Sequence, residues 1–340
     1  MARRNKNIKV ISLFSGCGGM DIGFMKAGFS IVYANDFDKD AVMTYEKNIG
    51  EIDNRDIKQV KIDEVPSADV LLAGFPCQPF SNAGNRKGVN DVRGTLFYDA
   101  LNFVRAKQPK VVVFENVRGL LSIVNNEGKK FIDEIVSRLD KVGKGYKVFY
   151  ELVNANDYGV PQNRMRLVLV GVRKDLKKTY RLPEKIDNSK TSLKFVLKNL
   201  PKNDLNDEHW ELSPQSKKLI VHIPAGGSWK SIPDKHLPER LKKIKANMRK
   251  YHAPNFYRRF SLDEVCGTIT AAATPENSGI IHPHKNRRYT VREIARIQSF
   301  PDNFKFVARS IAGKYKVIGN AVPPQLAFTI AKSIKSQIFS

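Results

Sequence analysis

Cysteine and histidine are both scarce in this chain of 340 residues. The three cysteines, Cys17, Cys77 and Cys266, are too few and too scattered for a disulfide framework, and without a C-x-x-C pair a zinc ribbon is not expected. All six histidines lie after residue 208, so the chemistry of the preceding part must proceed without an imidazole. His282 and His284 have no companion Cys or His at zinc spacing, and we therefore expect no metal site.

Apolar runs long enough to cross a membrane are missing as well, since a spanning helix needs about 18 to 20 apolar residues. The apolar stretch after the basic N-terminus has only the length of a strand, which argues against a signal peptide. We therefore expect a cytoplasmic protein that acts as a monomer.

Acidic residues are outnumbered by basic ones. The chain has 58 Lys and Arg but only 34 Asp and Glu, which gives a formal net charge of +24. Such an excess is typical of proteins that bind nucleic acid.

The first 175 residues alternate short apolar runs with amphipathic stretches. The apolar runs of strand length lie at 10–14, 30–33, 70–73, 111–114 and 167–170. Helical periodicity is seen at 38–48 and 129–142. This alternation predicts an α/β fold with a doubly wound, mostly parallel sheet, whose ligands bind at the carboxyl ends of the strands.

Beyond residue 175 the regular alternation stops, and prolines, both tryptophans and scattered basic residues take its place. We expect a first domain over 1–175, a smaller, irregular domain over 176–288, and a regular C-terminal part over 289–340. That last part contains two expected helices, 291–298 and 325–338, and the second is expected to return to the first domain.

A glycine-rich turn, Phe14 to Gly19, follows the first predicted strand. Glycines let the backbone approach a ligand and open a helix. The second strand ends at Asp36, 20 residues after Gly16, which is the spacing of a carboxylate that bonds ribose hydroxyls. The pattern predicts a nucleoside cofactor, either NAD or S-adenosylmethionine, although the glycines come earlier than in a pyrophosphate-binding motif. The candidates for contact with an adenine are Phe14, Phe37 and, after a further expected strand, Asp56 and Ile57.

Cys77 stands between two prolines at the end of the strand at 70–73. A lone cysteine is usually buried and inert, but a cysteine in a proline-flanked loop packs poorly as core. Glu115 directly follows the four apolar residues 111–114, where a carboxylate is costly unless it has a partner or a task. Because the carboxyl ends of parallel strands meet at one edge, Cys77 and Glu115 should face the same crevice.

Six motifs occur in one order along the chain. They are FSGCGG at 14–19, GFPCQPFS at 74–81, ENV at 115–117, QNRMR at 162–166, RExAR at 292–296 with FPD at 300–302, and GNAVP at 319–323. In this order they resemble the motifs of bacterial DNA (cytosine-5)-methyltransferases, over about 1–175 and 286–340. The region between does not match, which agrees with the variability of the family there.

The resemblance implies a mechanism and a role for each residue of the site. The Cys77 thiolate would add to C6 of a cytosine flipped out of duplex DNA, and C5 would then take the methyl group of S-adenosylmethionine, leaving S-adenosylhomocysteine. Glu115 would hold N3 and the exocyclic amine. Arg164 and Arg166, which strand alternation puts on one face, would hold the O2 side. The domain at 176–288 would recognise the target sequence.

Further residues carry over from the family by position. The expected cofactor contacts are Phe14, Ser15, Gly16, Gly18, Asp36, Phe37, Asp56, Ile57, Pro76, Leu96 and Asn320. The expected DNA contacts are Gln78, Ser81, Arg86 and Arg93 around the catalytic loop, and Arg258, Arg259, Thr268, Arg287 and Arg288 in and next to the recognition domain. Asn320 suits a helix-capping turn equally well, and the segment around Thr268 suits a buried strand. The family usually has Glu as the ribose acid, so Asp36 is one methylene shorter.

Three alternatives remain beside a sequence-specific DNA methyltransferase that protects DNA from a cognate restriction enzyme. A tRNA cytosine-5 methyltransferase shares the fold, but the long recognition region favours DNA and the Cys-Phe-Thr signature of the tRNA branch is missing. The presence of Cys77 and Glu115 argues against a non-catalytic DNA-binding relative. A NAD dehydrogenase lacks a hydride-handling His/Lys pair in the α/β half.

Overall fold

The computed structural model describes residues 7–75, 95–124, 128–187, 189–202, 204–247 and 255–340. The chain forms two compact units. Unit 1 comprises Met1–Asn154, Met165–Lys185 and Val322–Ser340, and unit 2 comprises Ala155–Arg164 and Ile186–Ala321. The division differs from the expected boundaries, because residues 289–321 belong with the irregular unit and the sheet unit is assembled from three stretches of chain.

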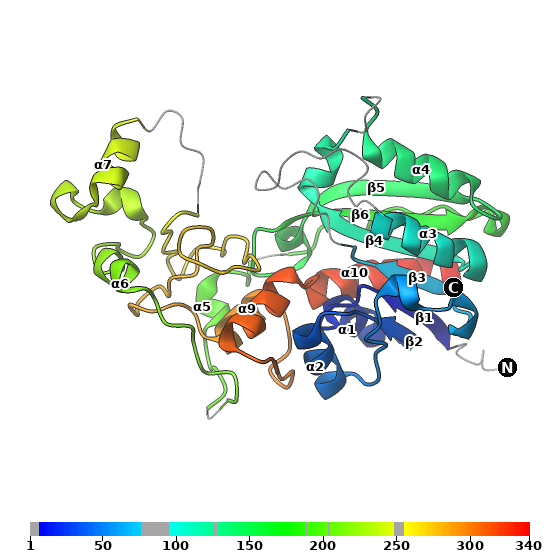
Figure 1. Ribbon diagram of the computed structural model, residues 1–340, viewed down its shortest axis with the longest axis horizontal. Helices are drawn as coiled ribbons and strands as arrows, with labels where there is room; N and C mark the ends of the chain where they lie inside the picture. Colours follow the sequence, from blue (N-terminus) through cyan, green and yellow to red (C-terminus); the bar gives the residue numbers. More distant parts are fainter. Residues whose placement is uncertain (1–6, 76–94, 125–127, 188, 203, 248–254) are drawn as a thin grey trace. The chain divides into compact units, whose positions relative to one another are not determined.

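Unit 1 is built on a six-stranded sheet with the strand order β2-β1-β3-β4-β6-β5 (Figure 1). The strands are β1 (Ile8–Leu13), β2 (Phe29–Asn35), β3 (Val70–Ala73), β4 (Val111–Val117), β5 (Tyr146–Asn154) and β6 (Met165–Arg173). The first four are mutually parallel, and β6 runs antiparallel to both β4 and β5. The expected α/β class with a mostly parallel sheet is therefore confirmed.

The helices of unit 1 cover both faces of this sheet. They are α1 (Gly19–Lys26), α2 (Lys39–Asn48), α3 (Thr95–Lys107), α4 (Phe131–Lys141) and α10 (Pro324–Ile334). Residues of α3 and α4 share one hydrophobic core with β1, β3, β4 and β6. On the other side, α1 packs against α10 at Gly23, where an added Cβ would lie 2.5 Å from the Cβ of Ala327. A glycine at this position thus allows the first and the last helix to touch.

Unit 2 is held by short helices and irregular segments. Its helices are α5 (Leu193–Val196), α6 (Pro214–Ile220), α7 (Glu239–Ala246), α8 (Val291–Ile297) and α9 (Ile311–Asn320). One hydrophobic cluster gathers around Trp229, with residues of α6 and α7. The expected helix at 291–298 corresponds to α8, whereas α9 was not predicted.

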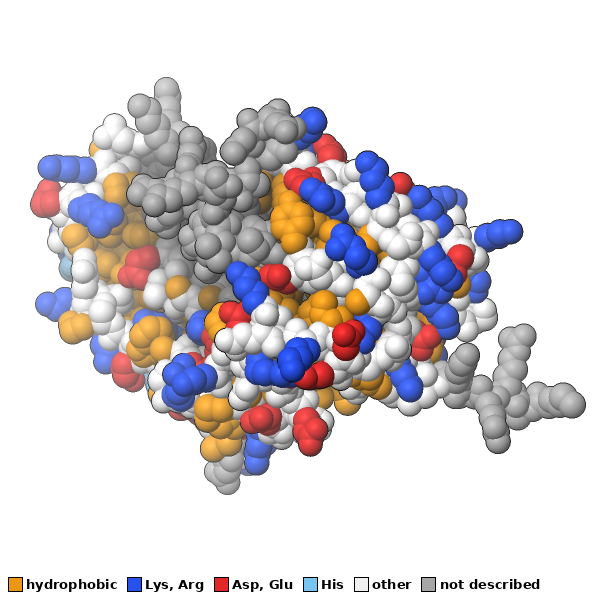
Figure 2. All heavy atoms as spheres, turned by 45° about the vertical axis from the view of Figure 1, so that its right-hand side comes forward, with side chains coloured by type: hydrophobic (Ala, Val, Ile, Leu, Met, Phe, Trp, Pro, Cys, Tyr) orange, Lys and Arg blue, Asp and Glu red, His pale blue; other side chains and the backbone are white. Residues whose placement is uncertain are grey.

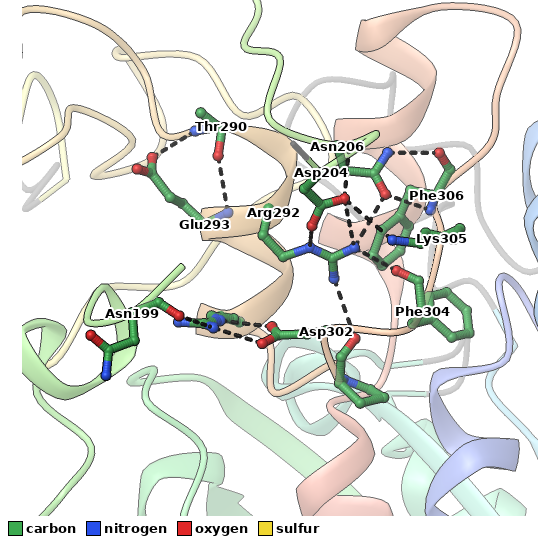
Figure 3. Close-up of polar contacts among 12 residues, drawn as sticks. Asn199, Asp204, Asn206, Thr290, Arg292, Glu293, Asp302, Phe304, Lys305 and Phe306 are labelled. Atoms are coloured by element: carbon green, nitrogen blue, oxygen red, sulfur yellow. Dashed lines mark hydrogen bonds and ion pairs between the residues drawn. The ribbon is translucent and has the colours of Figure 1, made fainter. Parts of the chain in front are cut away.

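A buried ion pair ties α8 to the preceding irregular chain (Figure 3). The guanidinium of Arg292 pairs with Asp204, and each side chain is only 1% exposed. Arg292 also donates to the carbonyls of Phe304, at 2.7 Å, and Pro301, at 3.2 Å. Asn206 extends the network through its own bond to the carbonyl of Phe306, at 2.9 Å. This arginine of the RExAR motif is therefore structural within unit 2.

The second arginine of that motif, Arg296, lies one turn further along α8. It pairs with Asp302 at 2.6 Å and donates to the carbonyls of Val196, Lys198 and Asn199. Together with Arg292 it joins three stretches of unit 2 that are distant in the sequence.

No helix in the described ranges is both long and apolar enough to cross a membrane. The same residues contain no cluster of three or more His, Cys, Asp or Glu side chains that could hold a metal ion.

Candidate active site

The turn after β1 has an unusual backbone. Phe14, Gly16 and Gly18 have φ angles of 55°, 57° and 89°. An added Cβ would meet nothing within 4 Å at Gly16, but at Gly18 it would lie 2.1 Å from Cδ1 of Ile49. The positive φ angle at position 16 therefore favours glycine, and the space that a side chain would fill there is open. At position 18 glycine also allows α2 to pack closely.

Asp36 directly follows β2 and closes this turn with its carboxylate. Oδ2 accepts the N–H of Gly16 at 2.8 Å, and Oδ1 accepts the N–H of Asp38 at 2.9 Å. The N–H of Ser15 donates to the carbonyl of Asn35 at 3.0 Å. A carboxylate oxygen can accept more than one hydrogen bond, so the bonds to Gly16 and Asp38 do not by themselves exclude a ligand hydroxyl. The structure thus brings together the glycine turn and the carboxylate that the spacing had paired.

A large apolar side chain lies beside this carboxylate. Phe37 is 64% exposed, which is unusual for phenylalanine. The turn, the carboxylate and the exposed ring fit a nucleoside, with acceptors for ribose hydroxyls and a face on which a base can stack.

The other expected cofactor residues differ in position. Asp56 caps the short 3-10 turn η1 (Ile57–Gln59) by accepting the N–H of Lys58 at 3.0 Å. The side chain of Ile57 is buried in the core, so only its backbone can face a ligand. Leu96 of α3 packs partly buried against the same core. The strand expected before Asp56 is wrong, because the chain there forms only an isolated bridge between Asn35 and Asp53.

Glu115 and Arg166 form an ion pair on neighbouring strands. Oε1 of Glu115 lies 2.8 Å from Nε of Arg166, and the side chains are 14% and 11% exposed. Val117 of β4 is directly opposite Arg166 of β6, so the pair is a diagonal contact on one face of the sheet. Burial lowers the pKa of Arg166, and the charge of Glu115 opposes that shift. The pair offers an acceptor and a donor side by side, which suits a polar ring edge.

Asn116, which lies between Glu115 and Val117 in β4, points to the other face of the sheet and is buried. Its Nδ2 donates to the carbonyl of Phe75 at 3.0 Å, and its Oδ1 accepts the N–H of Val117 at 2.8 Å. The ring of Phe75 packs 5.6 Å from that of Phe114, edge to face. Asn116 of β4 therefore holds the chain after β3 at Phe75, the last residue described there. Sequence reasoning gave Asn116 no role.

Several expected site residues lie outside the described residues. They are Pro76, Cys77, Gln78, Ser81, Arg86 and Arg93.

Arg164 directly precedes β6, the strand that carries Arg166. Regular strand geometry begins only at Met165, so alternation does not extend back to Arg164. The side chain is 1% exposed and donates to the carbonyls of Ile269 at 2.9 Å and Gly319 at 2.8 Å. Its guanidinium therefore ties together backbone segments of unit 2, which argues against a task on the O2 side of a base.

The arginines expected to contact DNA make extensive contacts within unit 2. Arg259 is 4% exposed and donates to the carbonyl of Ile220 at 2.9 Å and to Oδ1 of Asn286 at 2.7 Å. Arg288 is also buried and lies over the ring of Trp210. These two guanidinium groups support the fold, so the expectation of DNA contact is not supported for either.

The remaining candidates of unit 2 are less buried. Arg258 pairs with Glu264, and Arg287 pairs with Glu293 at 2.7 Å. Thr268 donates its hydroxyl to the carbonyl of Asn163 at 2.7 Å. Asn320 is exposed at the end of α9.

Residues 8–336 match the family described as C-5 cytosine-specific DNA methylase. Type II methyltransferase M.NgoFVII of Neisseria gonorrhoeae is 40% identical over 337 residues, which cover 96% of this chain and 86% of that protein. Type II methyltransferase M.FnuDI of Fusobacterium nucleatum is 35% identical over 350 residues, which cover 97% and 95% of the two chains.

Two solved structures share the fold. A DNA modification methyltransferase encoded within a prophage (E. coli) aligns with a TM-score of 0.69 at 23% identity, over 98% of this chain and all of the other. Spodoptera frugiperda DNMT2 aligns with a TM-score of 0.68 at 19% identity, over the same shares of the two chains.

Proposed function

The chain belongs to the family of C-5 cytosine-specific DNA methylases and is a DNA (cytosine-5)-methyltransferase, and from this premise we propose that Cys77 is its nucleophile. The observation that carries the proposal is the Glu115–Arg166 pair, 2.8 Å apart between β4 and β6, together with the bond from Asn116 of β4 to the carbonyl of Phe75, two residues before Cys77 in the sequence. In the sequence, the proposed nucleophile follows β3, which pairs with β4, the strand that carries Glu115.

The proposed chemistry follows from the poor nucleophilicity of C5 in cytosine. Addition of the Cys77 thiolate to C6 forms a C–S bond and shifts negative charge to N3 and O2 of the ring. Glu115 shares a proton with N3 and accepts the exocyclic amine, while the guanidinium of Arg166 stabilises the charge at O2. C5 then takes the methyl group, with S-adenosylhomocysteine as the leaving group. Water takes up the proton of C5, and elimination of the Cys77 thiolate restores the aromatic ring.

The proposed methyl donor is S-adenosylmethionine, which supplies an electrophilic sulfonium methyl when bound. The carboxylate of Asp36 would accept its ribose hydroxyls, and Phe37 and Phe14 would stack on its adenine. Asp56 and the backbone of Ile57 would contact the adenine edge. The open space before Gly16, the position of the Asp36 carboxylate at the glycine turn and the 64% exposure of Phe37 support this fit.

The proposed substrate is one cytosine in a specific duplex sequence. The target base is inaccessible inside the helix and must be flipped out at a cost of a few kcal/mol. Lys and Arg side chains lie across the face of the molecule in Figure 2, in keeping with the net charge of +24. Because the relatives quoted above are named Type II methyltransferases, we propose that methylation protects DNA from a cognate restriction enzyme.

One assay tests the substrate and the nucleophile together. The protein is incubated with methyl-labelled S-adenosylmethionine and either duplex DNA or tRNA, beside Cys77→Ala and the control Cys266→Ala. Cys266 is buried, and burial raises the pKa of its thiol to about 12, so it stays protonated and its removal should leave transfer intact.

We expect label in DNA from the wild type and from Cys266→Ala, and none from Cys77→Ala. Label on tRNA alone would contradict a DNA substrate, and label from Cys77→Ala would contradict the assigned nucleophile. Bisulfite sequencing of a methylated plasmid then gives the recognition sequence.

A further inference from the structure

Asp21, in the first turn of α1, is a carboxylate buried behind the glycine turn. Its Oδ1 accepts the hydroxyl of Ser12 from β1 at 2.6 Å, and its Oδ2 accepts the hydroxyl of Tyr45 from α2 at 2.7 Å. In the described part of the chain, no cation pairs with it. Three elements of unit 1 thus converge on one carboxylate that is stabilised only by hydroxyl groups.

The Ser12–Asp21–Tyr45 network touches the glycine turn at both ends. The hydroxyl of Ser15 donates to Oγ of Ser12 at 2.9 Å and to its carbonyl at 3.0 Å. The ring of Tyr45 lies 3.1 Å from the position that a Cβ on Gly18 would take. The N–H of Gly18 in turn donates to the carbonyl of Ser15 at 3.0 Å. The network therefore braces the turn at Ser15 and at Gly18.

This arrangement weakens the fold at neutral pH. Burial raises the pKa of Asp21 from 3.8 to about 6, although the bonds from Ser12 and Tyr45 oppose the shift. Since the folded-state pKa is the higher one, charging Asp21 lowers stability as pH rises through it. A costly charged group directly behind a ligand-binding turn indicates a functional task.

We propose that the Ser12–Asp21–Tyr45 network is a positioning device that holds the glycine turn in its cofactor-binding form while Asp21 is charged. The inference rests on the proposed S-adenosylmethionine site. A protonated carboxyl must donate to one of the two hydroxyls. If that hydroxyl is the one of Ser12, it can accept from both Asp21 and Ser15, but its own proton must turn away from Asp21, so the bonds that link the carboxylate to the turn rearrange.

A change in affinity near pH 6 is expected to come from Asp21, whose pKa is raised to about 6. The titratable groups that face it are Tyr45 from α2 and Cys17 from the turn, with Asp36 acting on Cys17 from the far side. Burial raises the pKa of both Tyr45 and Cys17 well above their ordinary values, so both stay protonated. Histidine is absent from the first 208 residues and from the last 19, which include all of unit 1.

The test measures the dissociation constant of S-adenosylhomocysteine by calorimetry between about pH 5 and about pH 8, without DNA. The variants are Ser12→Ala, Tyr45→Phe and Asp21→Asn. The matched control is Tyr98→Phe, which removes a tyrosine hydroxyl from a carboxylate, that of Glu134 at 2.7 Å, between α3 and α4.

We expect wild-type affinity to fall about tenfold as pH drops through the pKa of Asp21. Ser12→Ala and Tyr45→Phe each leave the carboxylate with one donor. Because each bond lowers the pKa of Asp21, the loss of affinity in these variants should occur at higher pH. Asp21→Asn should bind about tenfold more weakly at pH 8 and lose the pH dependence, while its thermal stability equals or exceeds that of the wild type. Tyr98→Phe should follow the wild type.

Thermal unfolding without ligand separates positioning from simple support of the fold. If Ser12→Ala and Tyr45→Phe unfold at lower temperature but bind with the wild-type constant across the pH range, the network only stabilises the fold and the inference is wrong. If the wild type binds no S-adenosylhomocysteine at any pH, the cofactor assignment itself is wrong.

Discussion

At the scale of single residues, the Glu115–Arg166 pair gives the sharpest test of the proposed chemistry. Glu115→Gln keeps the shape of the side chain but removes its charge and its ability to share a proton with N3. We expect the single-turnover rate of methyl transfer to fall about 100-fold or more, the usual cost of removing one group that stabilises developing charge. Binding of DNA and of S-adenosylhomocysteine should change by less than about threefold.

Glu134→Gln is the matched control for this prediction. Glu134 pairs with Arg138 at 3.2 Å and accepts the hydroxyl of Tyr98, but it lies on α4 rather than on β4. An equal loss of rate in both variants would leave Glu115 without a special role.

Individual residues were predictable where a local spacing carries the signal. The 20-residue interval paired Gly16 with Asp36, and the structure joins them at 2.8 Å. The prediction for Arg164 depended on strand alternation, but the strand begins only one residue later, so the local pattern does not settle the place of this side chain. Asn116 could not be found, since its partner, the carbonyl of Phe75, lies 41 residues earlier and leaves no mark in the local pattern.

At the scale of elements, the contact between α1 and α10 depends on one missing side chain. In Gly23→Ala the new Cβ would lie 2.5 Å from the backbone nitrogen of Phe328 and 2.6 Å from the carbonyl oxygen of Pro324, so the helices must separate. We expect a loss of about 1–3 kcal/mol in the free energy of unfolding, measured with urea. Met25→Ala on the exposed side of α1 should change it by less than about 0.5 kcal/mol.

The Arg292–Asp204 pair makes α8 sensitive to acid. Burial alone would raise the pKa of Asp204, but the hydrogen bonds and charge of Arg292 outweigh it and hold that pKa below its usual value. Because the folded-state pKa is depressed, the stability that the pair supplies is present above the unfolded-state pKa and is lost as pH falls through the folded-state value.

Arg292→Met leaves the Asp204 carboxylate buried without its partner and should cost about 3–5 kcal/mol near pH 7, measured with urea. The deficit relative to the wild type should shrink as the pH is lowered, because protonation of Asp204 removes the unpaired buried charge from the variant and the ion pair from the wild type. The double variant with Asp204→Asn should be more stable than Arg292→Met. A deficit that stays constant down to low pH would contradict this account.

Elements were predictable in proportion to their burial. All four residues of β3 are buried, and such a continuous apolar run is typical of a strand covered on both faces. The edge strand β5 was missed because most of its residues, such as Lys147 and Glu151, are partly or fully exposed and break any regular alternation. Helix α9 was also missed, since Gly313 and Gly319 weaken its helical pattern.

At the scale of the whole molecule, the charge of +24 predicts that DNA binding depends steeply on salt. With about 6–10 phosphate contacts, affinity for a non-cognate duplex should fall about 10³- to 10⁵-fold between about 50 and 200 mM salt. Filter binding at several salt concentrations measures the slope, and S-adenosylhomocysteine binding without DNA serves as the salt-insensitive control. A flat dependence would show that the excess charge does not meet phosphates.

The organisation of the whole chain was only partly predictable. The regular alternation of apolar runs and amphipathic stretches ends after residue 175, and this change distinguished a regular part of the chain from an irregular one. It could not show that residues 155–164 and 289–321 join unit 2, because that assignment depends on contacts between distant segments, such as the bond from Arg164 to the carbonyl of Gly319.

The three-part assembly of unit 1 has a consequence for biosynthesis. Helix α1 leaves the ribosome long before its partner α10, which spans Pro324–Ile334, has been made. A nascent chain therefore carries the uncovered face of α1 until α10 emerges. A message truncated before α10 would yield a protein with that apolar face exposed, which is the kind of surface that chaperones and proteases bind.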